Sequence, residues 1–153
     1  MDAVFDSDSE AATHTLGAAT ADRLRAGDVV LLAGGLGAGK STLARGLIAA
    51  LGFTGEVASP TFPIMLTYDP PETRLPVAHC DFYRLEDAEE AEELGLSDWL
   101  HDGAILAEWP DKGPGWLARD ALSVHIENVG EGRRRLTVSG GAAWKDRWPI
   151  ALP

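Results

Sequence analysis

The segment GGLGAGKST at residues 34–42 constrains the fold of this chain more than any other part of the sequence. It matches the phosphate-binding loop pattern, which is a glycine, four further residues and then Gly-Lys-Ser/Thr. Its four glycines allow the backbone to turn N–H groups toward a phosphate chain, and a helix that follows would aim its positive end at the same point. The segment therefore predicts an anion-binding loop.

The residues on either side of the loop fit a strand before it and a helix after it. Residues 29–33 are five consecutive apolar residues, which indicates a strand buried on both faces, as in a parallel sheet. Leucines and an isoleucine recur at helical spacing in residues 43–51, and Gly52 follows where such a helix would end. The alternative is a glycine-rich turn with an incidental lysine. It would not explain the strand-like segment before the loop and the helix-like segment after it.

The residue types in the loop indicate a nucleoside triphosphate with its magnesium ion. Lys40 is expected to reach the outer phosphates, and the Ser41 hydroxyl to become a ligand of Mg²⁺. The Asn-Lys-x-Asp guanine signature is absent from the sequence, so the expected cofactors are ATP and Mg²⁺. The residues expected to contact the nucleotide are Gly35, Leu36, Gly37, Ala38, Gly39, Lys40, Ser41, Thr42 and, further along the chain, Trp109.

Further apolar segments predict the rest of a sheet. Residues 64–68, 75–80 and 104–107 indicate strands, and residues 122–126 are expected to pair with 136–138 as an antiparallel hairpin. Near the N-terminus, Ser7 followed by Glu10 forms a capping-box pattern and predicts a helix that ends near Gly27. We expect one α/β domain over residues 1–153, with a P-loop NTPase-like, mostly parallel sheet flanked by helices and a C-terminal antiparallel hairpin.

Two predicted strands end on acidic residues, Asp81 and Glu108. Because ligands of open α/β sheets bind beyond the carboxyl ends of the strands, both acids can face the nucleotide. We expect Asp81 to hold Mg²⁺ directly or through its waters, and Glu108 to act as a base or to orient a water molecule. A helix cap at Asp81 and a surface position for Glu108 are the alternatives. Thr61 lies in an extended loop between two prolines that could close over the outermost phosphate.

The overall charge and composition exclude several classes of protein. The chain has 13 basic and 24 acidic residues, a formal charge of −11, which opposes unaided binding to nucleic acid. No apolar run is long enough for a membrane span, and the acidic start is unlike a secretory signal, so we expect a cytoplasmic protein. The single cysteine, Cys80, fits a reducing compartment and a small buried side chain. The acidic run at residues 86–98 indicates either a solvated helix face or a docking surface for a basic partner.

Four motifs in this order resemble the bacterial TsaE (YjeE) family: the loop at 34–42, SPTF at 59–62, HCDFYRL at 79–85 and EWP at 108–110. The resemblance implies a small P-loop ATPase required for threonylcarbamoyl modification of the tRNA adenosine next to the anticodon, acting with TsaB and TsaD type subunits. It assigns Lys40 and Ser41 to phosphate and Mg²⁺ and Asp81 to the metal side. It places Thr61 in one switch-like loop, and Glu108 with Trp109 in a second.

The sequence departs from the family pattern at two positions of the loop. Gly35 stands where the family usually has Asp, which removes a carboxylate near the phosphates, and Ser41 stands where it usually has Thr. Serine keeps the hydroxyl group, so the expected metal contact is retained.

Two other functions are compatible with the same loop. In a small-molecule kinase, Asp81 with Arg84 could bind the substrate as an acid and base pair, but an arginine-rich lid after the core strands is missing. A nucleotide-dependent scaffold would bind ATP without significant turnover. Apart from Lys40, the nearest basic residue in sequence is Arg84, and the arginines at 133–135 are expected to lie away from the site. We therefore expect slow hydrolysis without partners.

Overall fold

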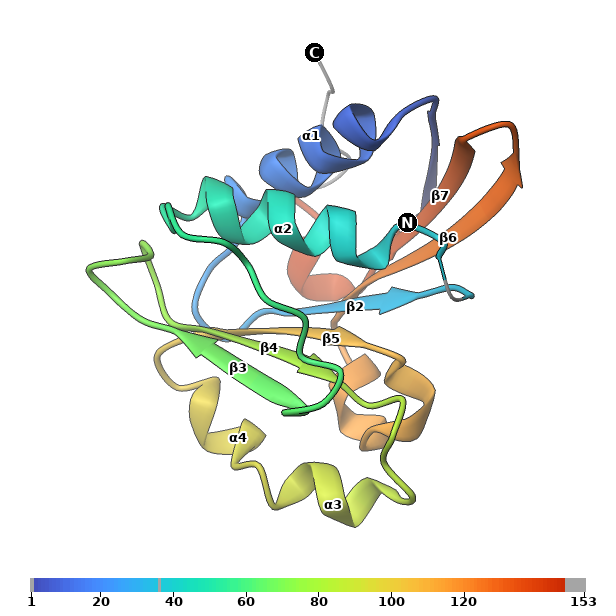
Figure 1. Ribbon diagram of the computed structural model, residues 1–153. Coiled ribbons are helices and arrows are strands. Elements are labelled where there is room, and N and C mark those ends of the chain that lie inside the picture. The colour runs from blue at the N-terminus through green and yellow to red at the C-terminus, as the bar shows by residue number, and fades with distance from the viewer. Residues whose placement is uncertain (1, 36, 148–153) are drawn as a thin grey trace.

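The computed structural model describes residues 2–35 and 37–147 of the chain. Leu36, one of the expected phosphate contacts, lies outside this description. A sheet with the strand order β1-β7-β6-β2-β5-β4-β3 runs through the described residues (Figure 1). The strands are β1 (Asp2–Ser7), β2 (Val29–Ala33), β3 (Met65–Tyr68), β4 (Val77–Asp81), β5 (Ala104–Glu108), β6 (Leu122–Gly130) and β7 (Arg133–Gly140).

The centre of the sheet is parallel, as the sequence predicts. Strand β2 pairs in parallel with β5 on one side and β6 on the other, and β5 pairs in parallel with β4. The edges are antiparallel, because β3 pairs with β4, and β7 pairs with both β6 and β1. The predicted α/β class, the mostly parallel sheet and the C-terminal hairpin are therefore confirmed.

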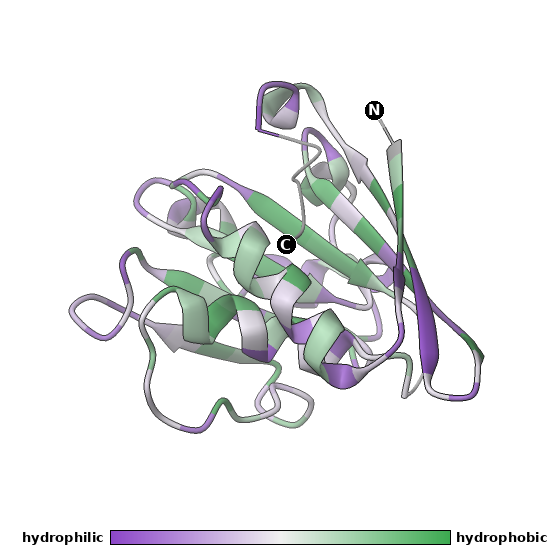
Figure 2. Cartoon of the chain, turned by 90° about the horizontal axis from the view of Figure 1, so that it is seen from above, coloured by the Kyte–Doolittle hydropathy of each residue, from purple (hydrophilic) through white to green (hydrophobic). Residues whose placement is uncertain are grey.

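Helices cover both faces of the sheet (Figure 1). On one face lie α1 (Glu10–Ala21) and α2 (Lys40–Ala50), and on the other lie the short helices α3 (Ala88–Glu92) and α4 (Leu96–Trp99). Seen from above, the central strands are strongly hydrophobic where α1 and α2 cross them (Figure 2). The side chains of Val30 and Leu32 pack with the first pair of helices, and those of Val29 and Leu31 belong to the core on the opposite face, as expected for a strand buried on both sides.

Helices α1 and α2 approach each other closely through two glycines. A Cβ atom at Gly17 would collide with the carbonyl oxygen of Leu43, and one at Gly46 would collide with the carbonyl oxygen of His14. The backbones can cross at this separation only because neither glycine has a side chain. This crossing holds α1 beside the predicted anion-binding loop that precedes α2, called the anion loop below (residues 34–39).

The first helix differs from the sequence prediction at both ends. Ser9, not Ser7, is its N-cap, and the Ser9 hydroxyl accepts a hydrogen bond from Ala12 N at 3.1 Å. Ser7 instead ends β1, a strand that was not predicted, and its hydroxyl is 2.7 Å from that of Thr13. The helix ends at Ala21 and not near Gly27. Pairing of β1 with β7 explains the later start, because it holds the chain extended up to Ser7.

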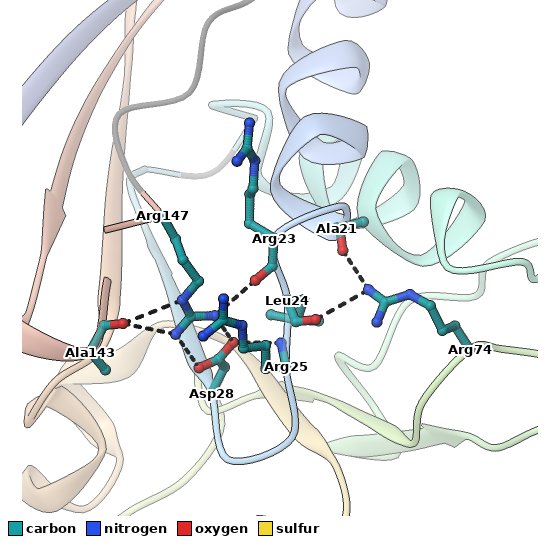
Figure 3. Close-up of polar contacts among 8 residues, drawn as sticks. All are labelled: Ala21, Arg23, Leu24, Arg25, Asp28, Arg74, Ala143 and Arg147. Atoms are coloured by element: carbon teal, nitrogen blue, oxygen red, sulfur yellow. Dashed lines mark hydrogen bonds and ion pairs between the residues drawn. The ribbon is translucent and has the colours of Figure 1, made fainter. Parts of the chain in front are cut away.

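Two arginines bind the carbonyl groups at the end of α1 (Figure 3). Arg74 Nη2 donates to the carbonyl oxygens of Ala21 and Leu24 at 2.7 and 3.2 Å. Arg147 Nη1 donates to the carbonyl oxygen of Arg23 at 2.8 Å and also forms an ion pair with the buried Asp28. Ala21 is the last residue of α1, so Arg74 satisfies one carbonyl that the helix end leaves without a partner, and the other two carbonyls belong to the turn that follows. Arg147 thus joins the chain after β7 to Asp28, the residue before β2.

The acidic segment forms two short helices on the outer side of the sheet. Asp87 is the N-cap of α3, and its carboxylate accepts a hydrogen bond from Glu90 N at 3.1 Å. Most of the acids in this segment are exposed, as a solvated helix face requires. None of the helices in residues 2–35 and 37–147 is long and apolar enough to cross a membrane.

Candidate functional site

The anion loop joins the end of β2 to the start of α2 and takes backbone conformations that favour glycine. Gly34, Gly37 and Gly39 have φ angles of 147°, 75° and 112°. Gly34 also has no room for a Cβ atom, because the carbonyl oxygen of Ile126 on β6 lies against it. Gly39 is the N-cap of α2 and provides no side chain to cap it. The first N–H groups of this helix are therefore available to an anion.

A pocket of about 290 Å³ opens at this end of α2. Its lining includes nearly all of the predicted site residues that the structure describes: Gly37, Ala38, Gly39, Lys40, Ser41, Thr42, Thr61, Asp81, Glu108 and Trp109. Gly35 is exposed and does not line the pocket, and a Cβ atom there would meet nothing within 4 Å. The structure therefore brings together four segments that are far apart in the sequence.

The two strand-end acids lie side by side on neighbouring parallel strands. Asp81 is the register partner of Glu108 in the β4–β5 ladder, and each residue is 4% exposed. The Asp81 carboxylate accepts hydrogen bonds from the Thr61 hydroxyl at 3.0 Å and from Tyr83 N at 2.9 Å. The contact with Tyr83 N is a local backbone cap, similar to the cap that the sequence analysis gave as the alternative role of Asp81. Asp81 makes this contact and also lines the pocket.

Thr61 lies where the sequence predicts a loop that can close over the site. Its hydroxyl group is also 2.8 Å from that of Ser59, so Ser59, Thr61 and Asp81 form a chain of polar contacts. This chain ties the loop to a strand-end acid.

Lys40 is held at the mouth of the loop by carbonyl groups and an aromatic ring. Its Nζ atom donates to the carbonyl oxygens of Gly34 at 2.6 Å and Gly35 at 2.9 Å, and lies 4.3 Å from the ring centroid of Trp109. Burial lowers the pKa of Lys40 below its ordinary value, although the negative charges of Glu108 and Asp81 oppose that change. The ammonium group is held by two carbonyl oxygens and an aromatic ring. It could exchange these partners for the oxygens of a bound anion.

The structure adds residues that sequence reasoning did not assign to the site. Ser9, Glu10, Thr13, Gly132 and Arg134 also line the pocket. Arg134 Nε donates to the carbonyl oxygen of Ala38 at 2.8 Å, and its Nη2 donates to that of Gly37 at 3.2 Å. The expectation that the hairpin arginines lie away from the site is therefore wrong for Arg134. It failed because β6 pairs directly with β2, which brings the hairpin beside the loop.

Arg84, which is the basic residue closest to Asp81 in sequence, does not line this pocket. Its guanidinium carbon is 4.9 Å from the centroid of the exposed Phe62 ring. The suggested acid and base pair of Asp81 with Arg84 therefore has no support in this pocket.

His79 lies next to the pocket without lining it, and the sequence analysis gave it no role. It lies behind Glu108, and its Nε2 atom is 2.7 Å from Glu108 Oε2. Alternation along a strand places His79 on the same face as Asp81, which is the signal that could have found it.

A glycine loop between a buried strand and a helix, faced by acids from two neighbouring strand ends, defines a P-loop NTPase-like α/β protein. The chain belongs to the TsaE family, because the model of "Threonylcarbamoyl adenosine biosynthesis protein TsaE" matches residues 7–136. The family resemblance in the four sequence motifs is thus confirmed.

Relatives from several bacteria agree with this assignment. The TsaE protein of Streptomyces coelicolor is 42% identical over 135 residues, which cover 84% of this chain and 91% of that protein. The TsaE protein of Bacillus subtilis is 39% identical over 126 residues, covering 82% of this chain and 77% of that protein. Both are named as tRNA threonylcarbamoyladenosine biosynthesis proteins. The crystal structure of Bacillus subtilis YdiB superimposes with a TM-score of 0.77 at 27% identity, covering 96% of this chain and 90% of that one.

Proposed function

We propose that this protein is an ATP-binding and ATP-hydrolysing accessory protein required for threonylcarbamoyl modification of the tRNA adenosine next to the anticodon. The observation that carries the proposal is the single pocket in which Lys40, Ser41, Asp81 and Glu108 meet at the N-terminus of α2. The names of its relatives support the pathway, and the pocket supports the chemistry. The formal charge of −11 favours a role in which partners, and not this chain, bind the tRNA.

The residues of the pocket fit a nucleoside triphosphate with its magnesium ion. The phosphates would lie against the first N–H groups of α2, and Lys40 would exchange the carbonyl oxygens of Gly34 and Gly35 for phosphate oxygens. The described residues hold no cluster of three or more His, Cys, Asp or Glu side chains that could bind a metal alone. The Ser41 hydroxyl and the Asp81 carboxylate would therefore share the ion with the phosphates. When bound, Mg²⁺ would neutralise charge on the phosphate oxygens.

The topology supports one orientation of the nucleotide in this pocket. Asp81 and Glu108 end the strands on one side of β2, whereas Thr13 of α1 and Arg134 of β7 reach the pocket from the other side. Glu108 can orient the attacking water only if the outermost phosphate lies on the side of Asp81 and Glu108. The nucleoside would then lie toward α1 and the hairpin.

Slow turnover by the isolated protein follows from the charges around the pocket. Lys40 and Arg134 are the basic side chains among the described residues that line it, and Arg134 is bound to loop carbonyls. The side of Asp81 and Glu108 therefore has Lys40 as its cation to stabilise the transferred phosphoryl group. We propose that TsaB and TsaD type subunits in the cytoplasm complete or order the site by packing against the Thr61 loop and the segment at Glu108 and Trp109.

The test is steady-state ATP turnover by the protein alone, with TsaB and TsaD type subunits, and with the same subunits and Glu108→Gln. We expect partners to raise turnover, by roughly 10³–10⁵-fold if they supply an arginine and by less if they only order a loop. Glu108→Gln should remove most of this gain. Phosphorylation of candidate acceptor compounds would support the kinase alternative, and an absence of turnover with partners present would support the scaffold.

A further inference from the structure

A buried histidine on β4 is joined to the strand-end acid of β5. The Nε2 atom of His79 is 2.7 Å from Oε2 of Glu108, and their side chains are 2% and 5% exposed. Among the described residues, the Glu108 carboxylate has no other hydrogen-bond partner. A short hydrogen bond between two buried side chains fixes the direction of both groups.

The β4–β5 ladder places His79 behind Glu108 as seen from the pocket. His79 pairs with Leu106 and Asp81 pairs with Glu108, so alternation puts all four side chains on the face that α2 covers. Asp81 and Glu108 line the pocket, whereas His79 does not. His79 can therefore affect a bound nucleotide only through the carboxylate in front of it.

The second ring nitrogen of His79 indicates which nitrogen donates to Glu108. Nδ1 is buried and has no hydrogen-bond partner among the described residues. With its only hydrogen on Nδ1, the ring would bury an N–H donor without an acceptor, and Nε2 would have no hydrogen to give to the carboxylate. The 2.7 Å contact therefore fits a hydrogen on Nε2 that is donated to Oε2 of Glu108.

We propose that His79 is a positioning residue: its Nε2–H group holds Oε2 of Glu108 and leaves Oε1 to face the pocket. This inference rests on the proposed role of Glu108 toward the attacking water. A carboxylate that is fixed at one oxygen presents the other in one direction, and ordering of this kind contributes to catalysis without direct contact with the substrate. The main chain of Glu108 is anchored as well, because its carbonyl oxygen accepts from Phe82 N at 3.1 Å.

Two amide variants of His79 provide matched tests. In His79→Gln the side-chain N–H₂ can reach about the position of Nε2, whereas in His79→Asn it reaches only about that of Nδ1. We expect His79→Gln to keep ATP turnover with partners within about threefold of the parent, and His79→Asn to lose about tenfold or more in kcat. Both should keep nucleotide affinity within about threefold, because His79 does not line the pocket. Thermal unfolding of both variants identifies any loss of turnover that comes from the fold.

Equal turnover by the two folded variants would overturn the positioning role and leave His79 as a core side chain. If the parent protein showed no turnover, alone or with partners, the proposed function would be contradicted. The position of the hydrogen on His79 could still be tested. Nitrogen NMR of the histidine rings then decides: a hydrogen on Nε2 of His79, with an Nε2–H resonance that moves in Glu108→Gln, supports the proposal. An Nε2 without hydrogen, or a resonance that does not move in Glu108→Gln, overturns it.

Discussion

The guanidinium group of Arg134 binds the carbonyl oxygen of Ala38, 96 residues earlier in the chain. The Nε–O distance is 2.8 Å, and Nη2 of the same side chain donates to the carbonyl oxygen of Gly37 at 3.2 Å. Because a peptide unit is planar, a fixed carbonyl also fixes the direction of the N–H group on its other side. Arg134 therefore orders two peptide units of the anion loop from the β6–β7 hairpin.

Replacement of Arg134 by alanine should weaken binding of ATP with Mg²⁺. Loss of one or two charge-assisted hydrogen bonds that order the loop costs about 1–2 kcal/mol, or roughly 5–30-fold in affinity. Calorimetric titration with ATP and Mg²⁺ measures this affinity. The matched control is Arg133→Ala, since Arg133 is an exposed neighbour on the same strand and does not line the pocket. Equal affinities of the two variants would show that the hairpin does not act on the loop.

Lys40→Ala should nearly abolish productive ATP binding, because the outer phosphates lose the lysine of the loop. The expected loss is roughly 1.5–3 kcal/mol, or about 10–150-fold in the dissociation constant. Lys145→Ala serves as the control, since it removes an equal charge from an exposed position outside the pocket. An affinity for Lys40→Ala within about threefold of the parent would contradict the role of this lysine.

Asp81→Asn should lower Mg²⁺-dependent hydrolysis more than nucleotide binding. The amide keeps the size of the side chain and an oxygen that can accept from Tyr83 N, but it removes the charge that would hold the metal. Turnover across a magnesium titration, with partners present, is the measurement. If the variant matched the parent at every magnesium concentration, Asp81 would serve only as the cap of the turn at Tyr83.

Local patterns were sufficient to predict the glycine loop between β2 and α2, the helix after it and the two strand-end acids. Each of these depends on residues within one short segment, where glycine content and apolar spacing constrain the backbone directly. The adjacency of Asp81 and Glu108 was also within reach, because both follow buried strands of one sheet.

Contacts that depend on strand order were not predictable in the same way. Arg134 reaches Ala38 only because β6 lies beside β2, and no local spacing encodes that neighbour. Strand β1 was missed because it is stabilised by pairing with β7, and Ser7 with Glu10 imitates the start of a helix. Such non-local pairing often overrides weak local preferences.

The buried thiol of Cys80 should make the free energy of unfolding depend on pH in the alkaline range. Burial, with a smaller contribution from the Asp81 charge, raises the pKa of Cys80 to about 12 from an ordinary value of 9.0. Above pH 9 the unfolded chain loses this proton while the folded chain keeps it, so the free energy of unfolding falls as pH rises. The slope from one proton is about 1.4 kcal/mol per pH unit.

The measurement is denaturant unfolding between pH 8 and 11 for the parent and for Cys80→Ala. Burial also raises the pKa of Tyr68, and it lowers that of Lys40, so only the difference between the two slopes is assigned to Cys80. We expect the variant to lose stability less steeply over this range, whatever its stability at neutral pH. Parallel curves would mean that the thiol ionises in the folded protein at its ordinary pKa.

The ion pair of Arg147 with Asp28 should stabilise the fold more than other arginine contacts at the end of α1. Arg147 donates to both carboxylate oxygens of Asp28, at 2.6 and 2.8 Å, and the two side chains are only 7% and 6% exposed. Arg147→Met would leave Asp28 as a buried charge without its partner, which costs about 3–5 kcal/mol. Arg74→Met is the matched control, because Arg74 binds carbonyl groups of the same region but no carboxylate, and its loss should cost about 1 kcal/mol.

Urea unfolding of both single variants, and of the double variant Arg147→Met with Asp28→Asn, measures these losses. The double variant should recover part of the loss, since it removes the stranded charge, whereas equal losses from Arg147→Met and Arg74→Met would reduce the ion pair to an ordinary helix-end contact.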